Sequence, residues 1–294
     1  MSAVSQDILK KIRRIQIVTT QLANDVLAGA YRSAFKGKGM EFEEVREYQP
    51  GDEVRSIDWN VTARMNHPYI KTFREERDLT VLLVIDVSAS SYFGSHYERK
   101  STLMAEIGGV LAFSAIKNND KIGLLLFSDV VEKYIPPRKG IRHVLRVIRE
   151  LLIFQPKHKG SNLGDALAFL GKVQNKRSIC FLISDFLCPD YRQEAALIAS
   201  KHDLIAIRIC DPYENTFPEL GLLHAADLET NESGIIDTSS SELQHRYTKE
   251  ADEEKRAFES LMKKMGADYM EISTDKSYIN VLKKFFKIRE KKRR

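Results

Sequence analysis

Short oxygen-bearing side chains stand at three places where an apolar run of the sequence ends or a helical pattern begins. Mg²⁺ and Mn²⁺ favour oxygen ligands, and Mg²⁺ usually keeps several bound waters, so carboxylates and hydroxyls at such places suit these ions. The Asp-x-Ser-x-Ser pattern alone also occurs as a helix cap after a strand, but the three places together favour an ion. We therefore predict a Mg²⁺ or Mn²⁺ site with one open coordination position. Its ligands, called the metal-site residues below, are Asp86, Ser88, Ser90, Ser161 and Asp185.

These side chains can meet only if the segments that carry them end at the same edge of one sheet. The runs 79–85 and 179–183 are apolar at successive positions, which is typical of central parallel strands that are buried on both faces. Ligands of parallel sheets bind beyond the carboxyl ends of the strands, where Asp86 and Asp185 stand. From residue 79 onward, strand and helix patterns alternate, which indicates an α/β fold: a doubly wound, mainly parallel sheet with helices on both faces.

The other elements of this region follow from periodicity and turn residues. Further strands are predicted at 121–127, 130–135 (an antiparallel edge strand), 204–209 and 268–272, with a hairpin at 222–227 and 234–237. Helices are predicted at 98–118, 141–154, 163–174, 192–201, 241–265 and from 277 onward.

The N-terminal part of the chain has a different pattern. Apolar residues at spacings of three and four predict an amphipathic helix over 5–28, which ends at Gly29. Residues 31–77 are charged, aromatic and interrupted by glycine and proline, without a helical period, which indicates short strands and turns. The predicted division is a segment of residues 1–77 packed on the main domain, a main domain of residues 78–290, and a basic tail at 283–294.

The metal-site residues resemble the metal-ion-dependent adhesion site of von Willebrand factor A domains. Residues 86–90 match its first loop, Ser161 stands where that family usually has Thr, and Asp185 matches the Asp of its third loop. Phe186 replaces the Gly that commonly follows this Asp. The resemblance covers residues 78–290 and implies a von Willebrand A-like fold.

A longer motif ahead of the site resembles the signature of the bacterial DUF58 family. It consists of the segments 39–46, 48–53, 55–59 and 62–64. This resemblance implies a von Willebrand A-like protein that is commonly encoded beside a MoxR-type AAA+ ATPase and works with it in chaperone-like maturation of other proteins.

The charged residues of this motif have two interpretations. They form either a buried ion-pair network around the single Trp that fixes the segment to the sheet, or a docking surface for a partner. We favour the network, since isolated surface ion pairs contribute little to stability. The residues are Arg46, Tyr48, Asp52, Arg55, Asp58, Trp59 and Arg64.

Composition and charge limit the class of protein. A chain of 294 residues with 43% hydrophobic content can bury a substantial core. It has no apolar stretch near the roughly 18 to 20 residues of a membrane span and no apolar signal-peptide block, so we expect a cytoplasmic protein with reduced cysteines. The formal charge is +5, and residues 283–294 contain eight basic residues and one acidic residue. Such a run is usually a solvated helix end; the alternative is binding to nucleic acid or acidic lipid.

Enzyme signatures are missing from the sequence. It has no Gly-x-Ser-x-Gly, Walker A, His-Glu-x-x-His or Gly-x-Gly-x-x-Gly pattern, and its seven histidines are scattered. The first hypothesis is a non-enzymatic, metal-dependent protein-interaction module, in which an acidic side chain of a MoxR-type ATPase or its client completes the metal site. The alternatives are a metal-assisted phosphoester hydrolase and an adaptor that binds nucleic acid or an anionic surface through the basic tail.

Overall fold

The computed structural model divides the chain into two compact units, one of residues 1–34 and 80–294, the main unit, and one of residues 35–79, the small unit. The structure describes residues 13, 15, 17, 40–75, 79–95, 99–188, 190–229 and 232–292.

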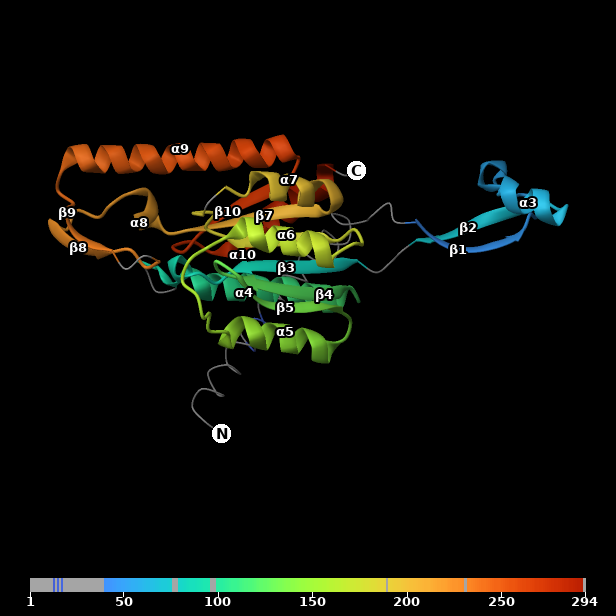
Figure 1. Ribbon diagram of the computed structural model, residues 1–294, viewed down its shortest axis with the longest axis horizontal. Coiled ribbons are helices and arrows are strands. Elements are labelled where there is room, and N and C mark those ends of the chain that lie inside the picture. The colour runs from blue at the N-terminus through green and yellow to red at the C-terminus, as the bar shows by residue number, and fades with distance from the viewer. Residues whose placement is uncertain are drawn as a thin grey trace. The chain divides into compact units, whose positions relative to one another are not determined.

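The main unit is built on a six-stranded sheet in the order β10-β7-β6-β3-β4-β5 (Figure 1). All neighbouring strands are parallel except β4 and β5, which are antiparallel. This arrangement confirms the predicted fold class, including its antiparallel edge strand. The strands are β3 (Thr80–Asp86), β4 (Lys121–Phe127), β5 (Val131–Arg138), β6 (Ile179–Ser184), β7 (Asp203–Cys210) and β10 (Asp268–Ser273).

The strand order reverses between β3 and β6. From β3 the chain continues to β4 and β5 on one side, and then it crosses to β6, β7 and β10 on the other. In doubly wound sheets, ligands bind in the crevice at such a reversal, beyond the carboxyl ends of the strands. Ile85 pairs with Ile183, so Asp86, the last residue of β3, and Asp185, the first residue after β6, lie at nearly the same level. The topology therefore places both carboxylates at the position where this class of fold binds ligands.

Helices cover both faces of the sheet (Figure 1). β6 is buried along its whole length and β3 along all but its first residue, because apolar side chains point to both helical layers. One layer consists of α4 (Lys100–Lys117), α5 (Ile141–Ile153) and α10 (Tyr278–Lys292). The other consists of α6 (Leu163–Val173), α7 (Arg192–Lys201) and α9 (Ser241–Met265). These helices lie within two residues of their predicted bounds.

The predicted N-terminal helix lies mostly outside the described residues. Arg13, Ile15 and Ile17 are helical, and Ile15 is buried. A Cβ atom at Gly109 in α4 would come within 3.0 Å of the Ile15 side chain, so glycine at this position allows close packing. This contact concerns Ile15 alone, and the packing of the rest of the segment lies outside the described residues.

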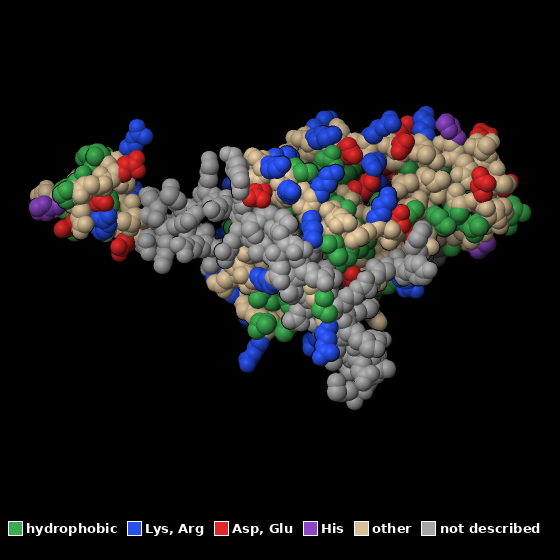
Figure 2. Space-filling model, turned by 180° about the vertical axis from the view of Figure 1, so that it is seen from behind, with side chains coloured by type: hydrophobic (Ala, Val, Ile, Leu, Met, Phe, Trp, Pro, Cys, Tyr) green, Lys and Arg blue, Asp and Glu red, His purple; other side chains and the backbone are tan. Residues whose placement is uncertain are grey.

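The chain forms a short helix and a hairpin between β7 and α9. The hairpin consists of β8 (Leu222–Ala226) and β9 (Ser233–Asp237), as predicted, and the helix is α8 (Pro212–Asn215). Figure 2 shows apolar side chains gathered at this end of the main unit. Leu220, Leu222 and Ile235 are 62%, 76% and 73% exposed, which is unusual for large apolar residues lying so close together.

The small unit contains the antiparallel pair β1 (Met40–Glu47) and β2 (Tyr69–Glu75), the short 3-10 helix η2 (Val54–Ser56) and α3 (Trp59–Met65). The short strands are confirmed, but the helix α3 was not predicted. It forms because the carboxylate of Asp58 accepts hydrogen bonds from the backbone of Asn60 and Val61, which caps the first turn.

The predicted buried network around Trp59 is wrong. Trp59 is 67% exposed, and Arg55 and Arg64 are exposed as well. Arg46 and Asp52 do form a two-bonded ion pair at 2.8 and 2.9 Å, but it is only partly buried. A tryptophan beside a helix cap stays exposed here because a two-stranded hairpin has too little apolar surface to enclose it.

Residues 283–292 of the basic tail form the end of α10. Lys284, Lys287, Lys291 and Lys292 are exposed, as expected for a solvated helix end. Arg289 differs, because it is buried and forms ion pairs with Asp203 and Asp268, the first residues of β7 and β10. No helix in the described part of the chain combines the length and apolar character needed to cross a membrane.

Candidate metal and partner site

Asp86 is the centre of a hydrogen-bonded cluster beyond the carboxyl end of β3. Its Oδ1 atom accepts a bond from the backbone N–H of Ser88 at 2.9 Å, and its Oδ2 atom accepts bonds from the hydroxyls of Ser161 and Ser184, both at 2.9 Å. The backbone N–H of Ala89 donates to the carbonyl of Lys159 at 2.8 Å, which ties the two loops together. The loop after β3 and the loop before α6 thus bring Ser161 to Asp86, although 75 residues separate them.

Ser88 and Ser90 connect Asp86 to the loop after β6. Their hydroxyl oxygens are 3.0 Å apart, and the Ser90 hydroxyl donates to Asp185 Oδ2 at 2.9 Å. Asp185 Oδ1 accepts a bond from the backbone N–H of Leu187 at 3.2 Å. All the metal-site residues therefore lie in one continuous cluster, with Ser90 partly exposed and the others buried.

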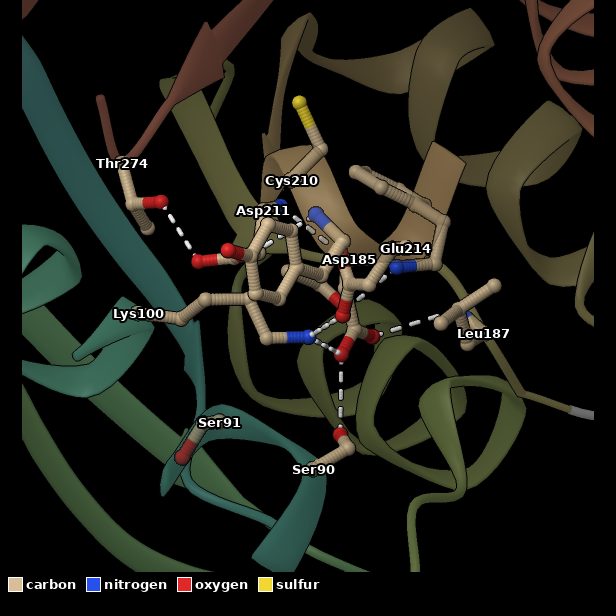
Figure 3. Close-up of polar contacts among 12 residues, drawn as sticks. Ser90, Ser91, Lys100, Asp185, Leu187, Cys210, Asp211, Glu214 and Thr274 are labelled. Carbon is tan, nitrogen blue, oxygen red and sulfur yellow. Dashed lines mark hydrogen bonds and ion pairs between the residues drawn. The ribbon is translucent and has the colours of Figure 1, made fainter. Parts of the chain in front are cut away.

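A buried lysine that the sequence analysis did not single out lies against this cluster. Lys100, the first residue of α4, is 0% exposed, and its ammonium lies between the carboxylates of Asp185 and Glu214 (Figure 3). The distance from Nζ to Asp185 Oδ2 is 2.7 Å. Burial lowers the pKa of Lys100, but the two carboxylates outweigh burial and the net direction is upward, so the ammonium stays charged.

Glu214 is held in place by α8. Asp211, which is fully buried, caps this helix, and its backbone N–H donates to Glu214 Oε2 at 2.8 Å. The carboxylate of Asp211 in turn accepts bonds from Ser95 and Thr274, so it joins the loops after β3 and β10 (Figure 3). The polar cluster therefore links five loops at the same edge of the sheet: those after β3, β6, β7 and β10 and the one before α6.

Negative charge exceeds positive charge in this cluster. The carboxylates of Asp86, Asp185 and Glu214 outnumber the single ammonium of Lys100 by two charges. The pKa of Asp86 is raised, mainly by burial and secondly by the charge of Asp185. Hydrogen bonds from Ser88 and Ser184 act in the opposite direction. Burial also raises the pKa of Glu214, which Lys100 offsets only in part. A divalent cation would balance the excess.

The loop after β6 contains a residue other than glycine in the left-handed backbone conformation that usually favours glycine. Phe186 has a φ of 62°, which costs a residue with a Cβ atom roughly 1–2 kcal/mol. Its ring is buried and packs on Tyr191 and Phe258, with centroids 5.8 and 4.7 Å away. Ser184 Oγ also accepts a bond from the Phe186 backbone N–H at 2.9 Å. Aromatic packing thus holds the conformation that glycine would adopt more readily.

The donor set fits a hard divalent ion. The neighbouring oxygens of Asp86–Ser161, Ser88–Ser90 and Ser90–Asp185 are 2.9–3.0 Å apart. Adjacent ligands of octahedral Mg²⁺ at roughly 2.0–2.1 Å from the metal are separated by about the same distance. Among the described residues, no three His, Cys, Asp or Glu side chains form a ready-made metal cluster, so hydroxyls and water would supply the remaining ligands.

An unsatisfied carboxylate oxygen also lies beside the cluster. Oε1 of Glu229, in the turn after β8, is buried and has no hydrogen-bond partner among the described residues. Burial and then the charges of Asp185 and Asp86 raise the pKa of Glu229, whereas the Ser90 hydroxyl lowers it. A buried acceptor without a donor is costly, and a cation at the cluster would remove that cost.

Sequence reasoning brought together the five metal-site residues and missed four others. Ser184 could have been found, because it is the last residue of β6 and stands directly before Asp185. No local sequence pattern marks Lys100, Glu214 or Glu229. Each comes from a different element and becomes part of the cluster only through the fold. That the five residues bind a metal stays a prediction.

The chain belongs to the DUF58 family. The family model, described as "Protein of unknown function DUF58", matches residues 44–257. "Uncharacterized protein Rv1480" of Mycobacterium tuberculosis is 28% identical over 279 residues, which are 93% of this chain and 87% of that protein.

Two solved structures show a general likeness to the chain. The conserved hypothetical protein BatB from Bacteroides thetaiotaomicron has a TM-score of 0.47 and 13% identity, over 72% of this chain and 99% of BatB. The von Willebrand A domain of SpRpn10 has a TM-score of 0.38 and 13% identity, over 70% of this chain and 93% of that domain.

Proposed function

We propose that this member of the DUF58 family is a metal-dependent protein-interaction module. In this proposal the metal-site residues hold Mg²⁺ or Mn²⁺, and a carboxylate of a partner protein takes the open coordination position. The observation that supports it best is the convergence of Asp86, Ser161 and Asp185 at the strand-order reversal, where they form one cluster with Ser88 and Ser90. The bound ion would supply a positive charge at the surface to which an acidic side chain binds.

The residues of this chain would each have a separate task. Asp86 and Asp185 provide negative charge. Ser88, Ser90 and Ser161 provide neutral oxygens, which add ligands without adding more negative charge. Lys100 fixes the orientation of the Asp185 carboxylate from the inner side. Such binding makes and breaks no covalent bond in the protein.

The surroundings of the cluster suit an interaction role. The exposed apolar residues of the β8–β9 hairpin belong to the same loop region as Glu229, and apolar surface of this kind is typical of protein interfaces. As partner we propose a MoxR-type AAA+ ATPase or its client, on the basis of the family resemblance. We propose the cytoplasm as the compartment, because the chain's three cysteines, Cys180, Cys188 and Cys210, are free thiols.

The hydrolase alternative has little support from the groups near the cluster. Burial and then the charges of Asp86 and Asp185 raise the pKa of Cys188 to about 12, so this neighbouring thiol is a poor nucleophile at neutral pH. Phosphatase and nuclease assays on the unmodified protein test this alternative directly.

Thermal unfolding with and without metal tests the site. An ion that binds only the folded state stabilises it by about 2.7 kcal/mol at 100 times its dissociation constant, so Mg²⁺ or Mn²⁺ should raise the melting temperature. Asp86→Ala should remove this rise. Asp129→Ala is the matched control, because Asp129 is a half-exposed carboxylate that follows β4 at the same sheet edge. Equal responses of the unmodified protein to Mg²⁺ and to EDTA would refute the metal site.

Binding to the partner tests the function. The purified MoxR-type ATPase of the same genome should bind in Mg²⁺, lose binding in EDTA and recover it when Mg²⁺ is restored. Asp86→Ala should abolish this binding, and Asp129→Ala should not. Binding that survives both EDTA and Asp86→Ala would refute the adhesion role, and metal-dependent hydrolysis that Asp86→Ala abolishes would establish the enzyme instead.

A further inference from the structure

A groove lies next to Asp185, between the loop after β6 and helix α9. Its volume is about 930 Å³, which is at the upper end of the range for ligand-binding pockets. Its walls are mainly apolar, with Phe186, Tyr191, Phe258 and Leu261 among the lining residues. Because Asp185 also lines it, the groove continues directly from the metal site.

One buried cation, Arg208 of β7, lines this groove. Its side chain is only 8% exposed, and its guanidinium lies over the Phe258 ring, 5.8 Å from the centroid. Its ion pair with Glu271 is long, at 3.7 Å, and Glu271 is already bound by Lys255 at 2.7 Å. Among the described residues, no acceptor forms a hydrogen bond with the Arg208 side chain.

An arginine in this state is ready to bind an anion. The guanidinium has five N–H donors, and Arg208 lines the open groove, so a ligand in the groove can reach them. The planar arrangement of these donors matches a carboxylate, which accepts two parallel hydrogen bonds from it. The apolar walls lower the local dielectric constant and would strengthen such a pair.

The other charges of the groove do not compete strongly for this position. Asp185 is held by Lys100 and Ser90, so its carboxylate is already satisfied. Asp190 is exposed and pairs loosely with Arg192 at 3.6 Å. The remaining charged lining residues, Glu254 and Lys264, have opposite signs and lie on α9.

We infer that the groove binds an acidic side chain of a partner protein together with an apolar side chain beside it. The carboxylate would bind Arg208, and the apolar side chain would pack on Phe258 and Leu261. This inference deepens the proposed function. It rests on that function only in assuming that the same partner also presents an acidic residue to the metal site. The partner segment would therefore carry two acidic residues, one for each position.

A pair of short peptides can test the groove without the metal site. The probes are acetyl-Gly-Phe-Glu-Gly-amide and its counterpart with Gln in place of Glu, titrated in EDTA and observed through the methyl resonances of Leu261. We expect the Glu peptide to bind with a dissociation constant on the order of 1 mM, as is usual for so small a ligand. The Gln peptide should bind about tenfold more weakly, because it loses the charge-assisted bonds.

Substitutions assign the effect to Arg208. Arg208→Met should weaken binding of the Glu peptide about tenfold, and Arg192→Met, which removes an exposed arginine at the rim, should leave it unchanged. Arg208→Lys should fall between the two, and it decides the question if Arg208→Met does not fold. Glu271→Gln should strengthen binding, because it removes the competing carboxylate.

The possible outcomes separate this inference from the proposed function. Equal binding of the two peptides, or equal binding by the unmodified protein and the Arg208 variants, would overturn the inference about the groove. Peptide binding that depends on Arg208 in a protein that does not respond to Mg²⁺ would support the groove and refute the metal site. The reverse pattern would leave the metal site standing without the groove.

Discussion

Asp185 follows β6 and Arg208 lies in the neighbouring strand β7, near the same sheet edge, but their charges are balanced in different ways. Asp185 accepts bonds from Ser90, Leu187 and Lys100, so its carboxylate is enclosed by donors from three elements. Arg208 is also buried, yet its one ion pair with the described part of the chain is 3.7 Å long. The first region is a closed, internally bonded cluster, and the second is an open groove with unused donors.

The difference indicates how the two regions would recognise a ligand. The closed cluster has excess negative charge, so it is suited to a small cation that fits among existing oxygens. The open groove has an underused guanidinium and apolar walls, so it is suited to a larger ligand that brings its own carboxylate. Selectivity would come from charge in the first region and from charge and shape together in the second.

Removal of the Lys100 ammonium should have the largest effect on this comparison. Lys100→Met leaves Asp185 and Glu214 as buried carboxylates without a cation, and breaking a buried pair in this way typically costs about 3–5 kcal/mol. The stabilisation by Mg²⁺ should then be greater than in the unmodified protein, because the ion replaces the lost charge. Chemical unfolding with and without Mg²⁺ measures both effects.

A matched control for this experiment is Lys133→Met. Lys133 pairs with Glu150 at 2.6 Å, but its side chain is 34% exposed, so its loss should cost about 1 kcal/mol or less. It should also leave the Mg²⁺ response unchanged. If Lys100→Met and Lys133→Met behave alike, the ammonium of Lys100 does not balance the charge of the cluster.

Phe186 lies between the two regions and should have the next largest effect. Phe186→Ala removes a buried ring that packs on Tyr191 and Phe258, a loss of about 3 kcal/mol, and keeps the positive φ. Phe186→Gly removes the same ring and relieves the backbone strain, so it should be more stable than Phe186→Ala by about 0.5–1 kcal/mol. Urea unfolding of the pair measures the difference. A glycine variant that is less stable than the alanine variant would show that the loop changes conformation when the ring is absent.

The fold was predictable because its signals are local and repeated. The strands 79–85 and 179–183 are apolar on both faces, and each is followed by a helical pattern, so the parallel sheet and the position of Asp86 and Asp185 follow directly. The helix α3 was missed because a polar, exposed helix of seven residues has no apolar period, and its cap, Asp58, is a residue that also favours turns.

The partners of the metal-site residues were not predictable for a physical reason. Lys100 is in the first turn of a helix, where a basic residue is electrostatically unfavourable and is expected to be solvated. It is buried only because Asp185 and Glu214, 85 and 114 residues away, compensate its charge. Arg208 likewise interrupts an otherwise apolar strand, and its meaning depends on the groove beside α9, which no local pattern reveals.

The smallest predicted effect concerns Glu229, whose substitution should raise stability without metal and weaken Mg²⁺ binding. Without metal, Glu229→Gln should stabilise the protein by a few tenths of a kcal/mol, because it removes a carboxylate that faces Asp185 and Asp86. With metal, the same change should weaken Mg²⁺ binding, because a negative oxygen beside the ion is lost. Melting curves over a range of Mg²⁺ concentrations measure both effects, and Glu219→Gln, an exposed change in the same connecting segment, should alter neither. A Glu229→Gln variant that is less stable without metal and binds Mg²⁺ normally would show that the carboxylate braces the hairpin and that the cluster is complete without it.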